Sequence, residues 1–137
     1  MPTITTRHAG YNLFETEVGE HVIENDVALS MGGADRAPTP PQLFVTSIGA
    51  CIGNFVLAYC IQAGLDSTDM RVEVDYEMAQ KPTRLTNLKA RVYLPKEELG
   101  TRLGAVYRAA EQCPVHATIN LWERLELDIF DRNNGSD

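Results

Sequence analysis

The sequence has few basic residues and no cluster of them. Its 137 residues include 12 Lys and Arg against 19 Asp and Glu, which gives a formal net charge of −7. Proteins that bind nucleic acids or anionic membrane surfaces ordinarily present a basic stripe or patch. The composition therefore argues against a nucleic-acid partner and against attachment to a membrane.

The first ten residues, MPTITTRHAG, lack the apolar stretch of a secretory signal peptide. The longest apolar stretch, residues 43–65, is interrupted by polar side chains and glycines, which favours a buried helix over a membrane span. Cysteine is also scarce: there are three, an odd number, so a framework of structural disulfides is not expected. We therefore expect a cytoplasmic protein whose cysteines stay reduced unless they perform redox chemistry.

Low-complexity runs and internal repeats are missing too, so nothing in the sequence divides the chain. Its 44% hydrophobic and 23% charged content is typical of a globular protein, and its length suits one domain with its own core. We expect a single domain over residues 1–131. A disordered tail over residues 132–137 should follow, because those residues are polar and unpatterned.

One segment, residues 42–63, is apolar on nearly every side of a helix, which predicts a helix buried on several faces. Thr39, at the end of a loop rich in glycine and proline, is placed to cap this helix. Gly49 and Gly53 share one helix face, where each costs ~1 kcal/mol of helix stability relative to alanine. We therefore expect another backbone to approach that face closely.

Alternating apolar and polar residues predict strands on both sides of this helix. Apolar residues at spacings of three and four predict a second helix from about residue 96. Pro114 ends it and can open a short third helix with Cys113 at the N-cap position. The predicted strands are short ones within 3–30, a hairpin from 70–79 (Val72, Val74, Tyr76 and Met78 inward) and 88–95, and a last strand over 124–130. This order predicts an α+β fold with antiparallel sheet.

The three cysteines differ in their surroundings. Cys60 lies nine residues after Cys51 on the same predicted helix, half a turn away in direction and about 13.5 Å along the axis, which is too far for a disulfide. We expect Cys60 in the core. Cys113, at a helix junction where backbone N–H groups can stabilise a thiolate, is the remaining candidate partner for Cys51. From the residues alone, a chemical pair and two small buried side chains both stay open.

Two motifs around these cysteines resemble the OsmC/Ohr superfamily. The stretch PTPPQLFVTSIGAC, residues 38–51, resembles the segment before the family's first cysteine, where prolines open the central helix and small residues surround the cysteine. The stretch CPVHATI, residues 113–119, resembles the second motif, in which the second cysteine precedes proline and a branched residue. The order of expected elements is similar along nearly the whole chain.

This resemblance implies a fold, an assembly and an activity. The fold would be the OsmC-like α+β fold, with antiparallel sheets that wrap central buried helices in an intertwined homodimer. The activity would be thiol-dependent reduction of organic hydroperoxides, without a cofactor. Cys51 would be the peroxidatic cysteine, which becomes a sulfenic acid, and Cys113 the resolving cysteine. A cellular dithiol would then reduce the resulting disulfide.

The sequence departs from the family pattern at one position. Peroxidases of the family activate the first cysteine with an arginine, which is held by a glutamate ten residues before that cysteine; here the position is Pro41. The neighbouring Gln42 can support the helix start or bond an arginine, but it carries no charge. Cys51 needs a nearby cation, because burial in apolar surroundings raises the pKa of a thiol. The candidates are Arg7, Arg36 and His116.

Two other interpretations follow from the same residues. An apolar pocket at a dimer interface could hold a small lipophilic ligand beside slow cysteines, which the loss of the glutamate favours. A metal site is disfavoured, because Cys113 and His116 form a single C-x-x-H pair and closed zinc sites usually have two such pairs. Its further ligands would be Cys51 with His8 or His21. We therefore expect no metal.

Overall fold

The computed structural model describes residues 2–132, so residues 133–137 of the predicted tail lie outside the described part of the chain. Two antiparallel sheets and three α-helices form an α+β fold, as the sequence predicts. The strands are β1 (Thr5–His8), β2 (Phe14–Val18) and β3 (His21–Asn25) in one sheet, and β4 (Arg71–Ala79) and β5 (Arg84–Tyr93) in the other. The helices are α1 (Pro40–Ala63), α2 (Leu103–Glu111) and α3 (Pro114–Asn120), with 3₁₀ turns η1 (Leu29–Met31) and η2 (Gly100–Arg102).

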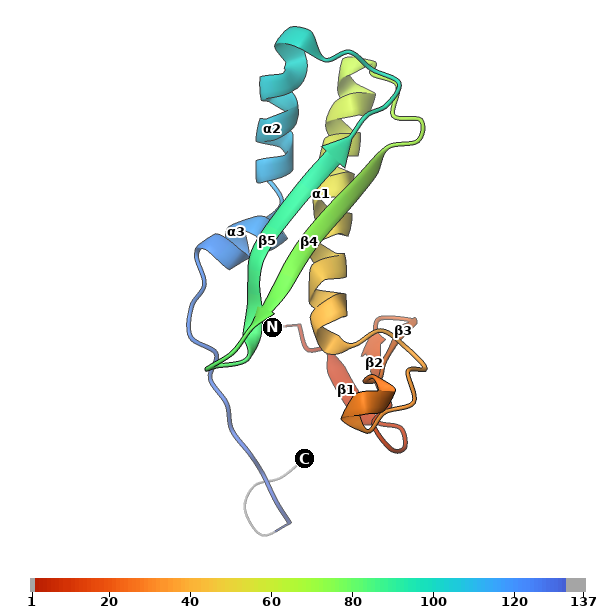
Figure 1. Cartoon of the computed structure of the whole chain (residues 1–137), viewed down its shortest axis with the longest axis vertical. Coiled ribbons are helices and arrows are strands. Elements are labelled where there is room, and N and C mark those ends of the chain that lie inside the picture. The colour runs from red at the N-terminus through yellow and green to blue at the C-terminus, as the bar shows by residue number, and fades with distance from the viewer. Residues whose placement is uncertain (1, 133–137) are drawn as a thin grey trace.

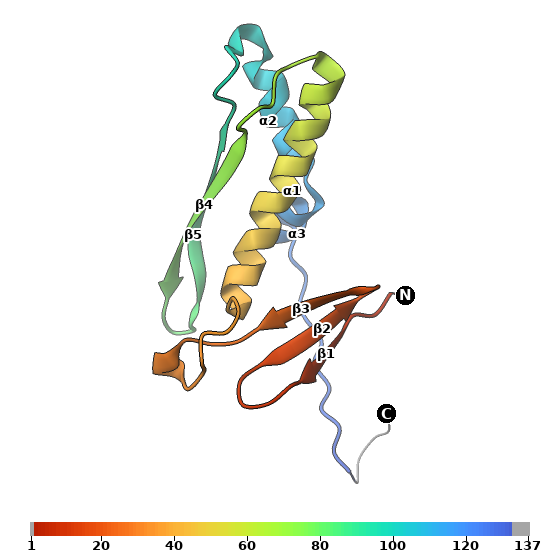
Figure 2. The same ribbon diagram turned by 90° about the vertical axis from the view of Figure 1, so that its right-hand side faces the viewer.

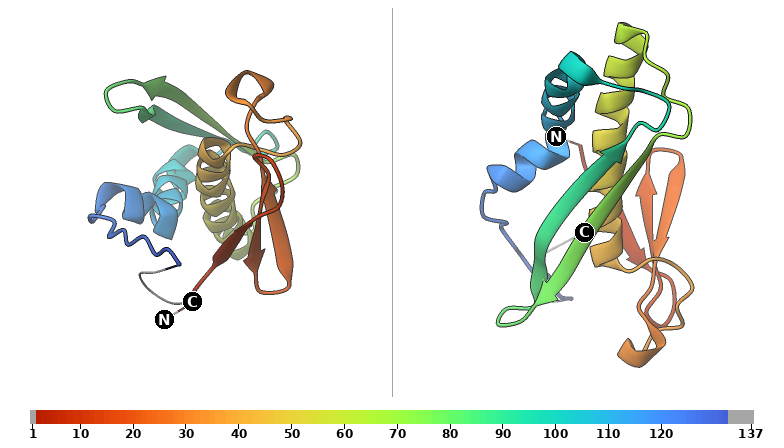
Figure 3. Two further views of the ribbon diagram at one scale, coloured as in Figure 1. Left: turned by 90° about the horizontal axis from the view of Figure 1, so that it is seen from below. Right: turned by 45° about the horizontal axis from the view of Figure 1, so that its top comes forward.

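Helix α1 forms the centre of the molecule (Figure 1). The β4–β5 hairpin lies along one side of it and α2 with α3 along another, as the view from below shows (Figure 3). The sheet β1–β2–β3 sits beyond the N-terminal end of α1 and projects away from it (Figure 2). Within the described residues the buried hydrophobic side chains are Val45, Ile48, Ile52, Val56, Cys60, Val106 and Cys113. The buried side chains therefore form a narrow seam on α1, α2 and the start of α3, and half-buried side chains of β4 and β5 pack against it.

The start of α1 explains why it begins two residues earlier than predicted. Thr39 Oγ1 accepts from the backbone N–H of Gln42 at 3.4 Å, and Gln42 Oε1 accepts from the N–H of Thr39 at 2.9 Å. This reciprocal capping box satisfies two backbone donors. Pro40 and Pro41 fill the first two helical positions, where the missing N–H costs nothing.

Only one face of α1 is buried within a single chain, whereas its composition predicted burial on several. The buried face is a single stripe: Val45, Ile48, Ile52, Val56 and Cys60. The other faces carry Phe44 and Ile61, which stay exposed, and small residues such as Ala50 and Ala58. By length and composition alone α1 passes for a membrane span, a property that it shares with core helices of soluble proteins.

The two glycines of α1 face side chains, not another backbone, so that expectation was wrong in its detail. A Cβ built on Gly49 would lie 3.5 Å from Val74 Cγ2, and one built on Gly53 would lie 3.6 Å from Val72 Cγ2. Both values are ordinary van der Waals contacts. Strand β4 therefore packs over this small-residue face through its valines.

The β4–β5 hairpin is longer than predicted, since β5 begins at Arg84 and not at residue 88. Val72 and Val74 face inward as expected, but Tyr76 is 38% and Met78 46% exposed. The ladder is irregular between Asp75 and Glu77, and this end of the hairpin extends beyond the cover of the helices (Figure 1).

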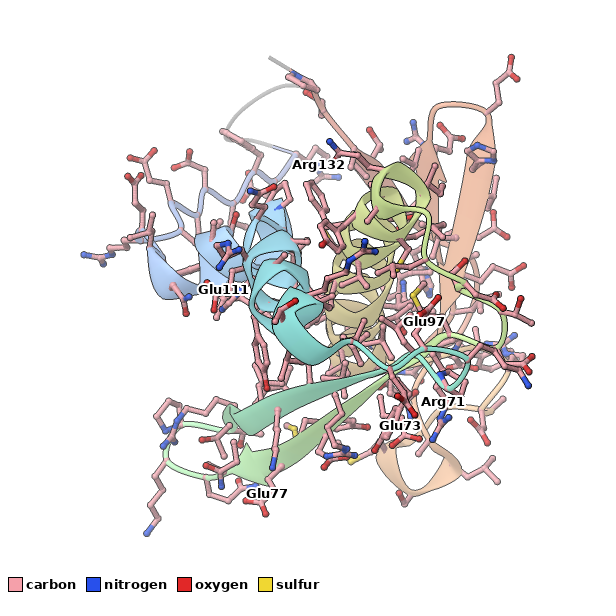
Figure 4. All side chains as sticks on the ribbon, turned by 90° about the horizontal axis from the view of Figure 1, so that it is seen from above. Arg71, Glu73, Glu77, Glu97, Glu111 and Arg132 are labelled. Atoms are coloured by element: carbon pink, nitrogen blue, oxygen red, sulfur yellow. The ribbon has the colours of Figure 1, made fainter. Side chains whose placement is uncertain are left out.

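The outer face of the hairpin is charged. Arg91 lies opposite Glu73 in the ladder and donates from Nη2 to Asp75 Oδ1 at 2.9 Å. Arg71 pairs with Glu73 at 3.1 Å and lies 3.9 Å from the ring centroid of Tyr93. Figure 4 shows Arg71 and Glu73 on the side of the sheet away from the helices. Cross-strand pairs of opposite charge of this kind keep one face of a sheet wet.

One predicted helix boundary and one predicted strand were wrong. The second helix begins at Leu103 and not near residue 96, because Gly100 adopts a left-handed φ of 53° that an α-helix does not accept. Residues 124–130 do not form a strand: they pair with no strand in the described part of the chain. A strand needs a partner edge for its backbone groups, and among the described residues this segment joins neither sheet.

Candidate active site

Cys51 and Cys113 are brought together by the packing of α1 against α2 and α3. Cys51 is half-buried on α1, and Cys113 is fully buried at the junction between α2 and α3. Both thiols are free. Burial and side-chain hydrogen bonding with Cys51 raise the pKa of the Cys113 thiol. Cys113 therefore holds its proton, and Cys51 is the more accessible sulfur of the pair.

Cys113 also caps α3, as the sequence predicts. Its Sγ accepts a hydrogen bond from the backbone N–H of His116 at 3.4 Å, and Pro114 occupies the first helical position. The N–H groups of His116 and Val115 favour the thiolate of Cys113, but burial outweighs them. The polar groups that act on the Cys113 thiol are thus Cys51 and the two backbone N–H groups of Val115 and His116.

Cys60 belongs to the core and not to this pair. It is fully buried on α1, one element of the seam that Val56 and Val106 also fill. Burial and the charge of Glu97 raise the pKa of its thiol. A neutral, buried thiol of this kind behaves as a small apolar side chain.

Arg36, one of the three candidate activators, is bound to Asp26. Arg36 Nε donates to Asp26 Oδ2 at 3.0 Å, and Arg36 Nη2 donates to the carbonyl of Gly10 at 3.4 Å. The structure thus engages Arg36 at the loop before α1 and with the N-terminal sheet. The local sequence around Asp26 predicts no specific role for this residue.

Asp26 is a buried carboxylate that organises this loop. It accepts from the backbone N–H groups of Val27, Ala34 and Arg36 at 2.8, 3.3 and 3.1 Å. Burial opposes its ionisation, but these bonds and Arg36 outweigh burial and lower the pKa of Asp26 to about 2. Close packing is part of the same loop, since a Cβ on Gly33 would lie 2.1 Å from the carbonyl oxygen of Val27. In the sequence, the only indication of this role is that Asp26 precedes a loop that contains two glycines.

Comparison with known proteins now decides the family. The family model for OsmC-like proteins matches residues 32–123, which include both cysteines and their motifs. This chain belongs to the OsmC-like family. No curated protein sequence matches it significantly.

Solved structures share the fold of this OsmC-like chain at low sequence identity. An osmotic stress induced and detoxification response protein from Psychrobacter arcticus superimposes with a TM-score of 0.77 and 21% identity over 86% of this chain and 88% of that one. An organic hydroperoxide resistance protein OsmC from Legionella pneumophila gives 0.62 and 22% over 85% and 87%. One from Elizabethkingia anophelis gives 0.64 and 19% over 86% and 89%.

The remaining predicted residues lie around the OsmC-like core in different ways. Arg7 is exposed on β1, opposite Glu15 in the ladder. His116 lies on α3, three residues after Cys113, and its backbone N–H donates to Cys113 Sγ. The side-chain oxygen of Gln42 accepts the N–H of Thr39 in the helix cap. Among the described residues, no group of three or more His, Cys, Asp or Glu side chains is placed to hold a metal ion.

A cavity of about 770 Å³ lies beside the cysteine pair without including it. Its walls come from α1, β5, α2 and α3, and they include Ile48, Ile52, Val106, His116 and Ile119. Glu97 and Glu111 are the acidic residues among its lining. Ligand pockets of this size are ordinarily apolar with a few polar groups. The sequence predicted an apolar pocket at a dimer interface, but its local patterns did not identify the residues that line this cavity.

Proposed function

We propose that this OsmC-like protein reduces organic hydroperoxides through Cys51 and Cys113. The observation that carries the proposal is the packing of the two cysteines in one cluster, with Cys51 half-buried and Cys113 fully buried. The organic hydroperoxide resistance proteins among its structural neighbours support the same chemistry. Two cysteines from different elements would meet in this way if one forms a disulfide with the other.

The division of roles follows from burial. A peroxide must reach the attacking sulfur, and Cys51 is the accessible one. Cys113 is fully buried and keeps its proton, so it is a poor nucleophile until Cys51 has been oxidised. Cys113 then acts as the resolving thiol because it packs in the same cluster as Cys51.

The reaction balances in three steps. The Cys51 thiolate attacks one oxygen of the hydroperoxide, the O–O bond breaks, and Cys51 becomes a sulfenic acid while the alkoxide takes a proton and leaves as an alcohol. The Cys113 thiol then condenses with the sulfenic acid, forming the S–S bond and releasing water. A cellular dithiol reduces the disulfide by exchange and restores both thiols.

We also propose that the working unit is a homodimer. One chain leaves large apolar side chains uncovered on β3, on η1 and along the C-terminal segment 121–130. In that segment Leu125, Leu127 and Ile129 are 74–80% exposed and alternate with Glu126 and Asp128. An extended, alternating, unpaired segment is suited to pairing with the sheet edge of a second copy.

The Cys51 thiolate needs a positive charge nearby. Pro41 replaces the family glutamate, and Arg36 is bound to Asp26 in the same chain. The backbone N–H of His116 donates to Cys113 Sγ, so His116 lies beside the cysteine pair. Arg7 lies on β1, and in a dimer Arg7 of the second copy could approach Cys51. We propose His116 of the same chain or Arg7 of a second copy as the source of the charge.

The experiment that tests the function is a turnover assay with cumene hydroperoxide and a dithiol reductant. Cys51→Ser should abolish consumption of the peroxide. Without the dithiol, Cys113→Ser should consume one equivalent of peroxide and leave a sulfenic acid that dimedone traps. Cys60→Ala is the matched control, because Cys60 is buried away from the pair, and it should keep the rate. Equal rates for wild type and Cys51→Ser would contradict the proposal.

A second function is favoured by the cavity. Its volume of about 770 Å³ and its largely apolar walls suit a small lipophilic ligand. In this alternative the chain binds such a ligand and the cysteines turn over slowly. Native mass spectrometry of the purified protein distinguishes the two, since a binding protein would retain a co-purified small molecule and show negligible peroxide consumption.

A further inference from the structure

The start of α3 depends on the position of one sulfur atom. Cys113 Sγ accepts from the backbone N–H of His116 at 3.4 Å and is the side-chain N-cap of α3. Pro114, at the first helical position, offers no N–H. The same sulfur interacts with the thiol of Cys51. One atom therefore serves both the proposed chemistry and the stability of the helix.

Helix α3 spans seven residues, and the other hydrogen bonds at its start are local to the helix. The N–H of Ala117 donates to the carbonyl of Cys113 at 3.0 Å, and Thr118 Oγ1 donates to the carbonyl of Pro114 at 2.8 Å. A helix this short relies on its cap and on side-chain packing. Val115 and Ile119 supply that packing against the core.

A change at the start of α3 would reach two other parts of the molecule. His116, Ile119 and Asn120 line the cavity. The helix ends at Asn120, directly before the exposed segment 121–130. The cysteine pair is thus connected to the cavity wall and to the C-terminal segment through a single short helix (Figure 1).

We propose that disulfide formation between Cys51 and Cys113 removes the N-cap of α3 and loosens this helix. The inference rests on the proposed function, in which a hydroperoxide oxidises Cys51 and condensation with Cys113 releases water. An S–S bond is about 2.05 Å long, with its dihedral angle near 90°, and is much shorter than the contact between two free thiols. We infer that closing this bond draws Cys113 Sγ off the N–H of His116, because that hydrogen bond is weak, with a sulfur acceptor at 3.4 Å.

Amide hydrogen exchange on the full chain tests this directly. The samples are the fully reduced protein and the protein treated with one equivalent of cumene hydroperoxide, with disulfide content quantified on both. We expect amides of residues 115–119 to exchange about fivefold faster or more in the disulfide form, the ratio that loss of one N-cap predicts. Amides in the middle of α1 should not change.

Three variants separate capping from oxidation. Cys113→Ser keeps a side-chain acceptor that is preferred at an N-cap but cannot form the disulfide, so peroxide should leave exchange in α3 unchanged. Cys113→Ala removes the acceptor, so α3 should exchange rapidly without peroxide. Cys51→Ser keeps the Cys113 cap and should also show no response to peroxide.

The outcomes distinguish this inference from the function on which it rests. Unchanged exchange in α3 at full disulfide content would overturn the loosening while leaving the peroxidase chemistry intact. Equal exchange in Cys113→Ser and Cys113→Ala would overturn the role of the side chain as a cap, whatever the peroxide does. Failure of the disulfide to form in wild type would overturn the proposed function, and the loosening with it.

Discussion

Arg36 Nε donates to the buried Asp26 Oδ2 at 3.0 Å, and three backbone N–H groups share the same carboxylate. This pair holds the two ends of the loop before α1 together. Arg36 Nη2 also donates to the carbonyl of Gly10, which connects the loop to the turn between β1 and β2. The arginine that sequence analysis considered for the active site therefore has a structural role within one chain. Because the Asp26 carboxylate is stabilised in the folded state, we expect the protein to lose stability when Asp26 is protonated in acid.

Asp26→Asn should destabilise the protein at neutral pH and weaken its response to acid. The folded-state pKa of Asp26 is lowered from 3.8 to about 2, so its contribution to stability is present above pH 4 and is lost as the pH falls from about 4 towards 2. Thermal unfolding of wild type and Asp26→Asn across that range measures the effect. Parallel curves would show that Asp26 does not carry it. Exposed Glu15→Gln is the control.

Because Arg36 is bound to Asp26, we expect His116 or Arg7, and not Arg36, to stabilise the Cys51 thiolate. Alanine at His116 or at Arg7 should shift the curve of Cys51 alkylation rate against pH to higher pH, because a lost cation disfavours the thiolate. Arg36→Ala should lower the melting temperature but leave that curve in place. Iodoacetamide labelling, read by peptide mass spectrometry, measures Cys51 separately from Cys60 and Cys113. If none of the three variants moves the curve, the charge comes from elsewhere.

Two glycines should respond to alanine in opposite directions. Gly33→Ala should destabilise the protein, since its Cβ would fall 2.1 Å from the carbonyl oxygen of Val27. Gly53→Ala should be tolerated or stabilise by up to ~1 kcal/mol, because alanine favours the helix and its Cβ meets Val72 Cγ2 at 3.6 Å. Chemical denaturation of both variants checks the pair, and a destabilised Gly53→Ala would indicate a closer neighbour in the assembly.

The C-terminal segment predicts the assembly. The chain should elute at twice its 15.2 kDa mass, and Leu127→Glu should weaken the dimer by about 1.5–3 kcal/mol per chain, the value of burying one leucine. Leu127 is 77% exposed in one chain, so a monomer would tolerate the change. Glu126→Gln, on the other side of the segment, is the matched control. Sedimentation at several concentrations measures both, and a monomeric wild type would refute the proposal.

Local patterns in the sequence were sufficient for most of the fold. The capped apolar segment became α1, the alternating segments became β4 and β5, and Cys113 took the N-cap position before Pro114. The resemblance also identified the family. Each of these features depends on residues that are close together in the sequence.

Features that depend on distant contacts could not be predicted in the same way. Residues 124–130 have a strand pattern, but in the described part of one chain they join neither sheet. Asp26 looks like an ordinary residue before a loop, and only the folded loop turns three N–H groups and Arg36 towards it. The local pattern of α1 likewise does not say which of its apolar faces one chain covers.

The most direct test of the central claim is a disulfide map after one equivalent of oxidant. Reduced protein is treated with cumene hydroperoxide, quenched within seconds, and digested without reduction for mass spectrometry. The account predicts a Cys51–Cys113 disulfide in the wild type, no such bond in Cys51→Ser, and a Cys60 thiol that stays reduced. Intact thiols at Cys51 and Cys113 after minutes of exposure would contradict it.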